Sequence, residues 1–170
     1  MSDIRVNRIL KYTTADGRGL RYSLYTQGCL HKCEGCHNPQ THSPQGGIVM
    51  SVEEIAEDIL NTPHITGITV TGGDPLYQYE AVTELCRSIR ENSNLNIILY
   101  TGYTYEVIEQ MYTDILSFVD YIVDGKFEKS LAVAGLYFRG SSNQNFIDVR
   151  ATCAASQMVT AAVGKRQIIT

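Results

Sequence analysis

Segments typical of strands alternate with segments typical of helices along this chain of 170 residues, and this alternation limits the folds open to it. Apolar residues recur at helical spacing in segments that begin near Ser51, contain Cys86 and begin near Thr104. Strands that alternate with helices form a parallel sheet with right-handed crossovers, so we predict an α/β fold. The predicted strands are residues 21–26, 68–71, 96–100, 121–123 and 146–149.

The length of the chain decides between a closed and an open barrel. A closed barrel of eight strand–helix units takes about 250 residues, and each strand–helix–strand unit takes roughly 30. We therefore expect an incomplete parallel (βα) barrel, formed by a single domain of residues 1–170 in which residues 151–170 are a tail of unknown role. An open barrel leaves a reactive centre uncovered, so we hypothesise that another macromolecule completes the pocket.

Glycine and polar residues follow the predicted strands. A cysteine-rich segment follows residues 21–26, Gly72-Gly73-Asp74-Pro75 follows the second strand, and Thr101-Gly102 and Asp124-Gly125-Lys126 follow the next two. Because the ligand site of such sheets lies at the carboxyl ends of the strands, we expect these segments to meet at one site.

Cys29, Cys33 and Cys36 stand at the spacing C-x3-C-x2-C. Three thiolates can hold an iron–sulfur cluster and leave one iron open, whereas an ordinary electron carrier takes four cysteines. The pattern therefore indicates a metal centre that acts on a bound molecule. The alternative is a structural zinc site. Its fourth ligand would be a nearby histidine: His31, His37 or His42.

Composition excludes several classes of protein. Hydrophobic residues make up 44%, which argues against global disorder. The net charge of -4 and the lack of a basic run argue against nucleic acid as the main partner. We expect no membrane span and no secretory signal, and free cysteines without an export signal indicate the cytoplasm. Cys86 is expected to pack in the core, and Cys153 receives no role.

The cysteine segment in its setting, DGRGLR at residues 16–21 and QGCLHKCEGCHNP at residues 27–39, resembles the radical S-adenosylmethionine activases. These enzymes install glycyl radicals in partner proteins. The subgroup that activates the anaerobic ribonucleoside-triphosphate reductase is similar to this chain in four further segments. They are TGGDPL at residues 71–76, YTGY at 100–103, VDGKF at 123–127 and FRGSSNQ at 138–144.

The resemblance implies an oxidoreductase with a 4Fe–4S cluster on Cys29, Cys33 and Cys36 and with S-adenosylmethionine on the open iron. One electron from the cluster would yield methionine and a 5′-deoxyadenosyl radical, which would take a hydrogen atom from a glycine of the reductase. The implied electron donor is a reduced flavodoxin-like protein. Two other functions stay open: an activase of another glycyl radical enzyme, such as pyruvate formate-lyase, and a zinc-binding module without catalysis.

The resemblance also implies contacts with S-adenosylmethionine. The strand end at Gly72 and Gly73, with the carboxylate of Asp74, would bind the amino group of its methionine part. The backbone from Gly35 through Cys36 to His37 would serve the adenine. A tight turn before Pro75 is the alternative for the glycine pair.

Three further polar residues follow later strands. Asp124 and Lys126 would hold the ribose and the carboxylate, although Asp-Gly-Lys is also typical of a solvated turn. Thr101 is predicted at the site, with a plain capping or turn role as the alternative. For the FRGSSNQ segment we leave open a surface loop and a contact with the cofactor or the partner.

Overall fold

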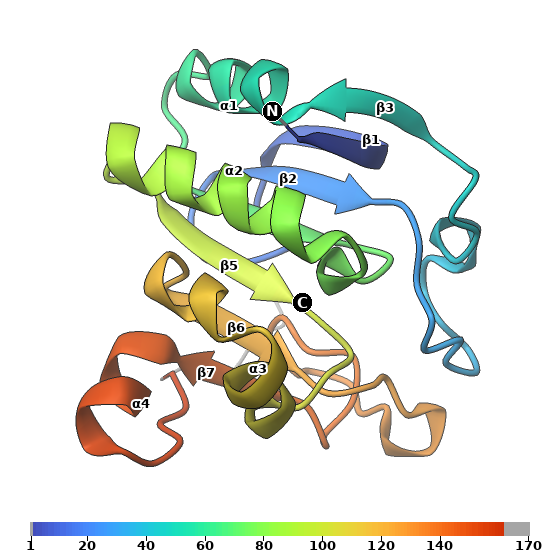
Figure 1. Ribbon diagram of the computed structural model, residues 1–170. Helices are drawn as coiled ribbons and strands as arrows, with labels where there is room; N and C mark the ends of the chain where they lie inside the picture. The colour runs from blue at the N-terminus through green and yellow to red at the C-terminus, as the bar shows by residue number, and fades with distance from the viewer. Residues whose placement is uncertain (1, 162–170) are drawn as a thin grey trace, which may run out of the picture.

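The computed structural model describes residues 2–161 and contains one seven-stranded sheet with the strand order β3-β1-β2-β4-β5-β6-β7 (Figure 1). The strands are β1 (Asp3–Thr13), β2 (Arg21–Thr26), β3 (Ile48–Ser51), β4 (Gly67–Gly72), β5 (Asn96–Tyr100), β6 (Tyr121–Asp124) and β7 (Asn145–Asp148). The α-helices are α1 (Val52–Leu60), α2 (Tyr79–Asn92), α3 (Tyr105–Met111) and α4 (Val149–Ala155).

The sheet is mixed. The central strands β2, β4, β5 and β6 run parallel, whereas β1 is antiparallel to β2 and β3, and β7 is antiparallel to β6. The α/β class is therefore confirmed, but the expectation of a wholly parallel sheet is wrong at both edges. Residues 14–20 join β1 to β2 and are too few for a crossover, and residues 125–144 before β7 contain no α-helix to make one.

The main hydrophobic core lies between the sheet and helices α1, α2 and α3, which cover one face (Figure 1). Ile55 of α1, Leu85 of α2 and Leu99 of β5 are completely buried there. Helix α1 begins with a reciprocal capping interaction: Ser51 accepts a hydrogen bond from the backbone N–H of Glu54, and the Glu54 side chain accepts one from that of Ser51. Cys86 is fully buried in this core, as predicted.

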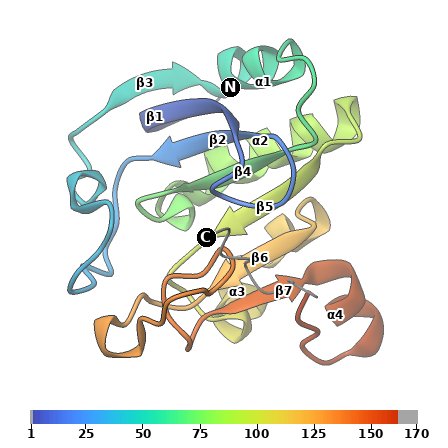
Figure 2. The ribbon, with the colours of Figure 1, turned by 180° about the vertical axis from the view of Figure 1, so that it is seen from behind.

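In the part of the chain that the structure describes, no helix lies over the centre of the opposite face of the sheet, which is turned to the viewer in Figure 2. The connections of residues 14–20 and 125–144 lie along it instead (Figure 2). A small apolar cluster of Ile98, Val123 and Phe146 is the main buried apolar group here. Because no helix packs on this face, the space beside the carboxyl ends of the central strands is available for a site.

Arg21 joins the central strands at their amino ends. Its guanidinium is completely buried and donates hydrogen bonds to Thr69 Oγ1 and Asn96 Oδ1, both at 2.7 Å, and to the carbonyl of Ile68. Burial lowers the pKa of Arg21 to about 10. The network therefore fixes the sheet at the end opposite to the cysteines.

Part of the unassigned tail packs at the β7 edge. Asp148 caps α4 by accepting a hydrogen bond of 2.9 Å from the backbone of Ala151, and Thr160 bridges to Ile147 of β7. Residues 162–170 of the tail lie outside the described residues.

Candidate active site

The three clustered cysteines lie in the connection after β2, called here the cysteine loop (residues 27–42). The loop is closed at its base, because the backbone N–H groups of Gly28 and Cys29 donate to the carbonyls of Thr41 and His42 at 2.7 and 3.2 Å. All three cysteines are free and partly exposed. The loop therefore begins and ends beside the carboxyl end of β2, with its thiols accessible.

Local hydrogen bonds shape the cysteine loop around its thiols. The backbone N–H of Cys36 donates to the carbonyl of Cys33 at 3.2 Å, and that of Asn38 donates to Cys36 Sγ at 3.4 Å. Gly35 has a φ of +74°, in the left-handed region that glycine favours. Partial burial raises the pKa of the Cys29 thiol.

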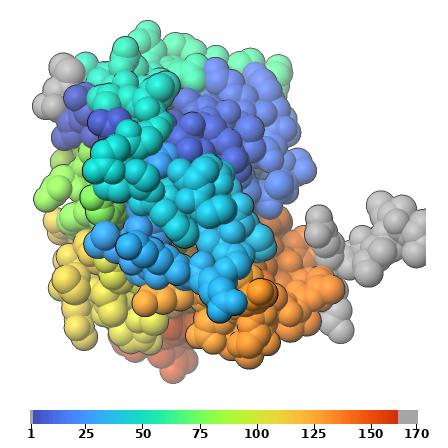
Figure 3. Space-filling model, turned by 90° about the vertical axis from the view of Figure 1, so that its right-hand side faces the viewer, coloured from blue at the N-terminus to red at the C-terminus, as the bar shows by residue number. Residues whose placement is uncertain are grey.

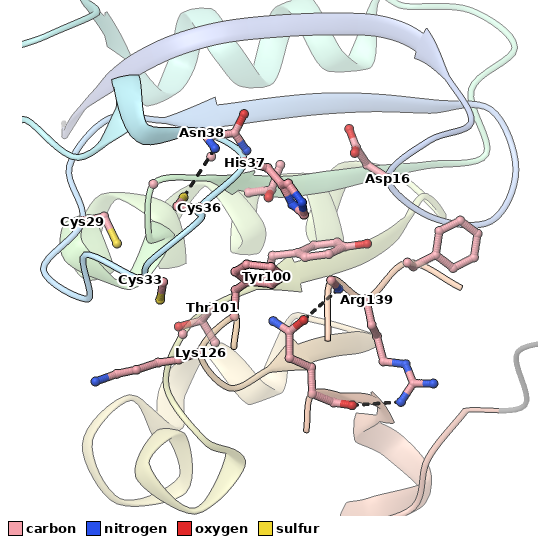
Figure 4. Close-up of a pocket in the computed structure, with 18 of the residues that line it drawn as sticks. Asp16, Cys29, Cys33, Cys36, His37, Asn38, Tyr100, Thr101, Lys126 and Arg139 are labelled. Atoms are coloured by element: carbon pink, nitrogen blue, oxygen red, sulfur yellow. Dashed lines mark hydrogen bonds between the residues drawn. The ribbon is translucent and has the colours of Figure 1, made fainter. Parts of the chain in front are cut away.

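A cavity of about 730 Å³ opens beside the loop, and all three cysteines line it (Figure 4). This size suits a small-molecule ligand. In Figure 4 the thiols gather at one end of the cavity, while Asp16 and Arg139 lie at the other. The predicted site residues His37, Gly72, Gly73, Thr101 and Lys126 also line it.

The two glycines at the end of β4 allow a close approach of backbones. A Cβ at Gly72, where φ is +109°, would lie 2.4 Å from the backbone N of Thr26, and one at Gly73 would lie 2.3 Å from the carbonyl of Gly28. The backbone N–H groups of Gly73 and Asp74 donate to the carbonyls of Thr26 and Gly28, both at 2.9 Å. Glycine at these positions therefore joins β4 to the start of the cysteine loop, in addition to lining the cavity.

Three predicted residues do not line this cavity. Gly35 is not part of the lining, and a Cβ on it would meet Lys129 Cδ at 3.3 Å. Asp74 is 2% exposed, and its carboxylate accepts hydrogen bonds from inside the protein, including one of 3.0 Å from the backbone of Leu76. Asp124 is equally buried and accepts from the backbone N–H groups of Tyr105 and Asn145 at 3.0 Å. The structure thus gives both carboxylates internal partners.

Lys126 stands between two cavities. It lines the main cavity and a smaller one of about 300 Å³, which Asp124 also lines. Its neighbour Phe127 packs against His37, with ring centroids 5.0 Å apart. In Figure 3 the residues 126–144, in orange, lie directly against the light-blue surface of the cysteine loop.

Several lining residues escaped prediction, although strand alternation could have found some of them. Tyr25 pairs with Thr71 across β2 and β4, and Tyr100 follows Leu99, the partner of Val70, so these three side chains share one face of the sheet. Asp16 accepts a hydrogen bond of 2.6 Å from the hydroxyl of Tyr25. Burial is the main cause that raises the pKa of Tyr25 to about 12, and the bond to Asp16 adds to it.

The donor set fits an iron–sulfur cluster with a bound ligand. Three thiols line one cavity, and two buried side-chain nitrogens of cavity residues, His42 Nε2 and Arg139 Nε, have no hydrogen-bond partner within the described protein. Among residues 2–161, no three His, Cys, Asp or Glu side chains are grouped so as to hold a single metal ion. The two unpaired nitrogens are open hydrogen-bonding groups that remain for a ligand.

A family model and individual relatives both indicate the family of this chain. A family model described as a 4Fe–4S single cluster domain matches residues 15–147. The anaerobic ribonucleoside-triphosphate reductase-activating protein of Enterobacteria phage T4 is 39% identical over 143 residues, which are 81% of this chain and 90% of the relative. The proteins of the same name from Vibrio cholerae and Escherichia coli K12 are 35% and 33% identical, each over 76% of this chain and 88% of the relative. The chain belongs to this family of activating proteins.

The match to the 4Fe–4S family model supports an iron–sulfur cluster as the group that this chain binds. The matched range covers the cysteine loop and the strand ends that line the cavity. Within residues 2–161, the activating protein has no helix both long and apolar enough to cross a membrane.

Proposed function

We propose that this protein activates an anaerobic ribonucleoside-triphosphate reductase by generating a glycyl radical in it. The observation that carries the proposal is one cavity lined by three accessible thiols and by the glycine-rich end of β4. The names of the relatives support the reductase as the partner and protein substrate. The protein is then a radical S-adenosylmethionine oxidoreductase.

Cys29, Cys33 and Cys36 would hold the 4Fe–4S cluster, and the cavity beside them would hold S-adenosylmethionine. When bound, this pair supplies reductive cleavage of a carbon–sulfur bond and hence hydrogen abstraction from glycine. Gly72 and Gly73 would present backbone groups to the methionine part, and the ammonium group of Lys126 would face a carboxylate. These assignments accord with the lining of the cavity.

Other predicted contacts have a narrower basis. The backbone of Gly35 to His37 stays our proposal for the adenine, and Thr101 lines the cavity but also contacts Asp74. For Asp74 and Asp124 we propose indirect roles, because their carboxylates are occupied by internal hydrogen bonds.

We also propose that the mixed sheet is the incomplete barrel of the radical S-adenosylmethionine type and that residues 1–170 form its single domain. The parallel order β2-β4-β5-β6 supports this, because the cavity lies at the carboxyl ends of these strands. The open face would be completed by the reductase. The free cysteines of this chain suit a reducing compartment, and we propose the cytoplasm. We also propose that a reduced flavodoxin-like protein donates the electron and that nucleic acid is not a partner.

The decisive experiment is anaerobic purification followed by activation of the reductase. We expect about four irons per chain, and a glycyl radical signal in electron paramagnetic resonance after the reduced protein, S-adenosylmethionine and the reductase are mixed. Cys33→Ala should abolish the signal because it removes a cluster ligand. The matched control Cys153→Ala alters an exposed cysteine outside the cavity and should leave the signal unchanged.

The alternatives predict different results in the same experiment. Zinc without iron would identify a zinc-binding module, and a radical formed in pyruvate formate-lyase but not in the reductase would identify a different activase. Full activation by Cys33→Ala would contradict the ligand assignment.

A further inference from the structure

The cysteine loop is joined to the end of β4 through a buried pair of side chains, His31 and Asp74. His31 Nε2 lies 2.5 Å from Asp74 Oδ2, within reach of an N–H that donates to the carboxylate, and the two side chains are 8% and 2% exposed. His31 stands between the ligand candidates Cys29 and Cys33, whereas Asp74 directly follows Gly72-Gly73. The pair therefore connects the thiol-bearing segment to the strand end that lines the same cavity.

Asp74 is itself held by the neighbouring strand end. Thr101 Oγ1 lies 2.9 Å from both carboxylate oxygens, and the backbone N–H of Gly102 donates to Oδ2 at 3.0 Å. The backbone of Leu76 donates to Oδ1 at 3.0 Å. An ionised carboxylate offers about four acceptor positions, so Asp74 is fully engaged, and His31 is its only link to the cysteine loop by a side chain.

The surroundings of His31 fix the orientation of its ring. A Cβ at Gly102 would lie 2.4 Å from His31 Cδ2, so only glycine leaves room for the imidazole. The ring of Tyr103 packs edge-on against it, with centroids 4.6 Å apart. Packing and hydrogen bonding thus select one placement of the side chain.

The other polar side-chain contact between the middle of the loop and residues 126–144 is weaker. The base of the loop is held by backbone bonds, but Glu34 reaches Lys129 only at 3.6 Å, and these side chains are 86% and 67% exposed. Exposed ion pairs of this kind contribute little to stability. The contact of His31 with Asp74 is therefore the main buried polar contact in the part of the loop that leads from its base to Cys33.

We propose that His31 and Asp74 are positioning residues that hold the three thiols in place relative to the Gly72–Gly73 strand end. The proposal rests on the proposed function in that the thiols bind a cluster. Neither side chain needs to touch the cluster or S-adenosylmethionine. Side chains that orient metal ligands through hydrogen bonds typically change metal affinity by roughly 10- to 100-fold when they are replaced.

The first test uses the apoprotein and is independent of any cluster. In His31→Leu, we expect the backbone amide of Cys36, which donates to the carbonyl of Cys33 within the loop, to exchange hydrogen at least about tenfold faster, since the hydrogen bond to Asp74 is lost. Amides of β4 and β5 should keep their exchange rates. His31→Gln retains an N–H donor and should restore much of the protection. Leu30→Ala is the matched control, because Leu30 is the adjacent residue and is 68% exposed.

The second test measures iron release to a chelator from the reconstituted protein. Release should be roughly 10- to 100-fold faster in His31→Leu than in the wild type, with His31→Gln between them and Leu30→Ala unchanged. In an Asp74→Asn background, His31→Leu should add little, because its partner has already been removed.

Each contrary result has a distinct meaning. Equal amide exchange in His31→Leu and Leu30→Ala would overturn the proposal, and so would faster exchange with unchanged iron release. A wild-type chain that takes up no iron would refute the proposed function, while the exchange experiment would still decide whether the pair orders the loop. Faster exchange of the β4 and β5 amides would show that His31→Leu is unfolded. Amide exchange in the loop and iron release are then compared between Asp74→Asn, in which both should be faster, and His31→Gln, in which both should stay closer to the wild type.

Discussion

The cysteines of this chain differ in exposure, and we expect them to differ in reactivity for that reason. Cys29, Cys33 and Cys36 line the cavity and are partly exposed, Cys153 is exposed, and Cys86 is completely buried. Burial raises the pKa of the Cys86 thiol to about 12. Because the thiolate is the reactive form, burial protects Cys86 both by excluding reagents and by lowering its thiolate fraction.

We predict that iodoacetamide labels Cys29, Cys33, Cys36 and Cys153 of the folded apoprotein but not Cys86. A raised pKa means a smaller thiolate fraction at any given pH, so Cys86 should stay unlabelled from neutral to mildly alkaline pH. Mass spectrometry of proteolytic peptides measures the labelling. Denatured protein is the control, in which Cys86 should react; labelling of Cys86 in the folded protein at the rate of Cys153 would contradict the prediction.

Residues that line the cavity were predictable where residue chemistry alone points to them. Spacing singled out the three thiols, and glycine content singled out Gly72 and Gly73, all of which line the cavity, while their roles as ligands stay a prediction. The surroundings of Asp74 and Asp124 could not be predicted, because backbone donors distant in sequence occupy their carboxylates. A carboxylate that follows a strand can face a ligand or hold two strand ends together, and the sequence pattern is the same in both cases.

At the scale of elements, the start of α1 combines several local signals. Ser51 and Glu54 form reciprocal hydrogen bonds of 2.9 to 3.1 Å, and Ser51 is also the last residue of the edge strand β3. The capping interaction therefore fixes the point where the chain leaves the sheet and enters the helical layer.

We predict that Ser51→Ala lowers the free energy of unfolding by about 0.5–2 kcal/mol, because an N–H at the helix start loses its acceptor. Chemical denaturation of the apoprotein measures the change. Ser130→Ala serves as the control, since Ser130 is exposed and no side-chain hydrogen bond is described for it. An equal effect in both variants would show that the capping interaction does not stabilise the fold.

The predicted elements differ from the structure mainly at the edges of the sheet. Residues 21–26 and 96–100 were predicted with their observed bounds, because residues 97–100 are an apolar run and residues 21–26 are rich in residue types that favour strands, such as Tyr22 and Tyr25. Strands β1 and β3 were missed. Only Ile4 and Val6 of β1 are fully buried, its remaining residues are largely polar, and β3 has just four residues. Antiparallel strands that have one face in solvent need fewer apolar residues, so their sequence pattern is weak.

At the scale of the whole molecule, one face of the sheet packs in the hydrophobic core and the other face lines the cavity. Leu99 of β5 packs in the core beneath the helices, whereas its neighbour Tyr100 points to the opposite face and lines the cavity (Figure 4). The stability of the molecule should therefore depend on one face and its binding properties on the other.

We predict that Leu99→Ala lowers the free energy of unfolding by about 2–5 kcal/mol, because it leaves a cavity in a fully buried core. Tyr100→Phe removes only a hydroxyl group and should cost less than about 1.5 kcal/mol. Urea denaturation of the two apoprotein variants compares them directly. A similar loss in both would mean that the cavity face contributes to folding as much as the helical face.

The base of the cysteine loop is closed by the polypeptide itself, without the help of a bound group. The two backbone bonds to Thr41 and His42 complete the loop, and the helices pack on the far face without contributing a thiol to the cavity. The main chain alone therefore closes the loop, and we expect the protein without metal to keep this scaffold and to take up iron when it is reconstituted.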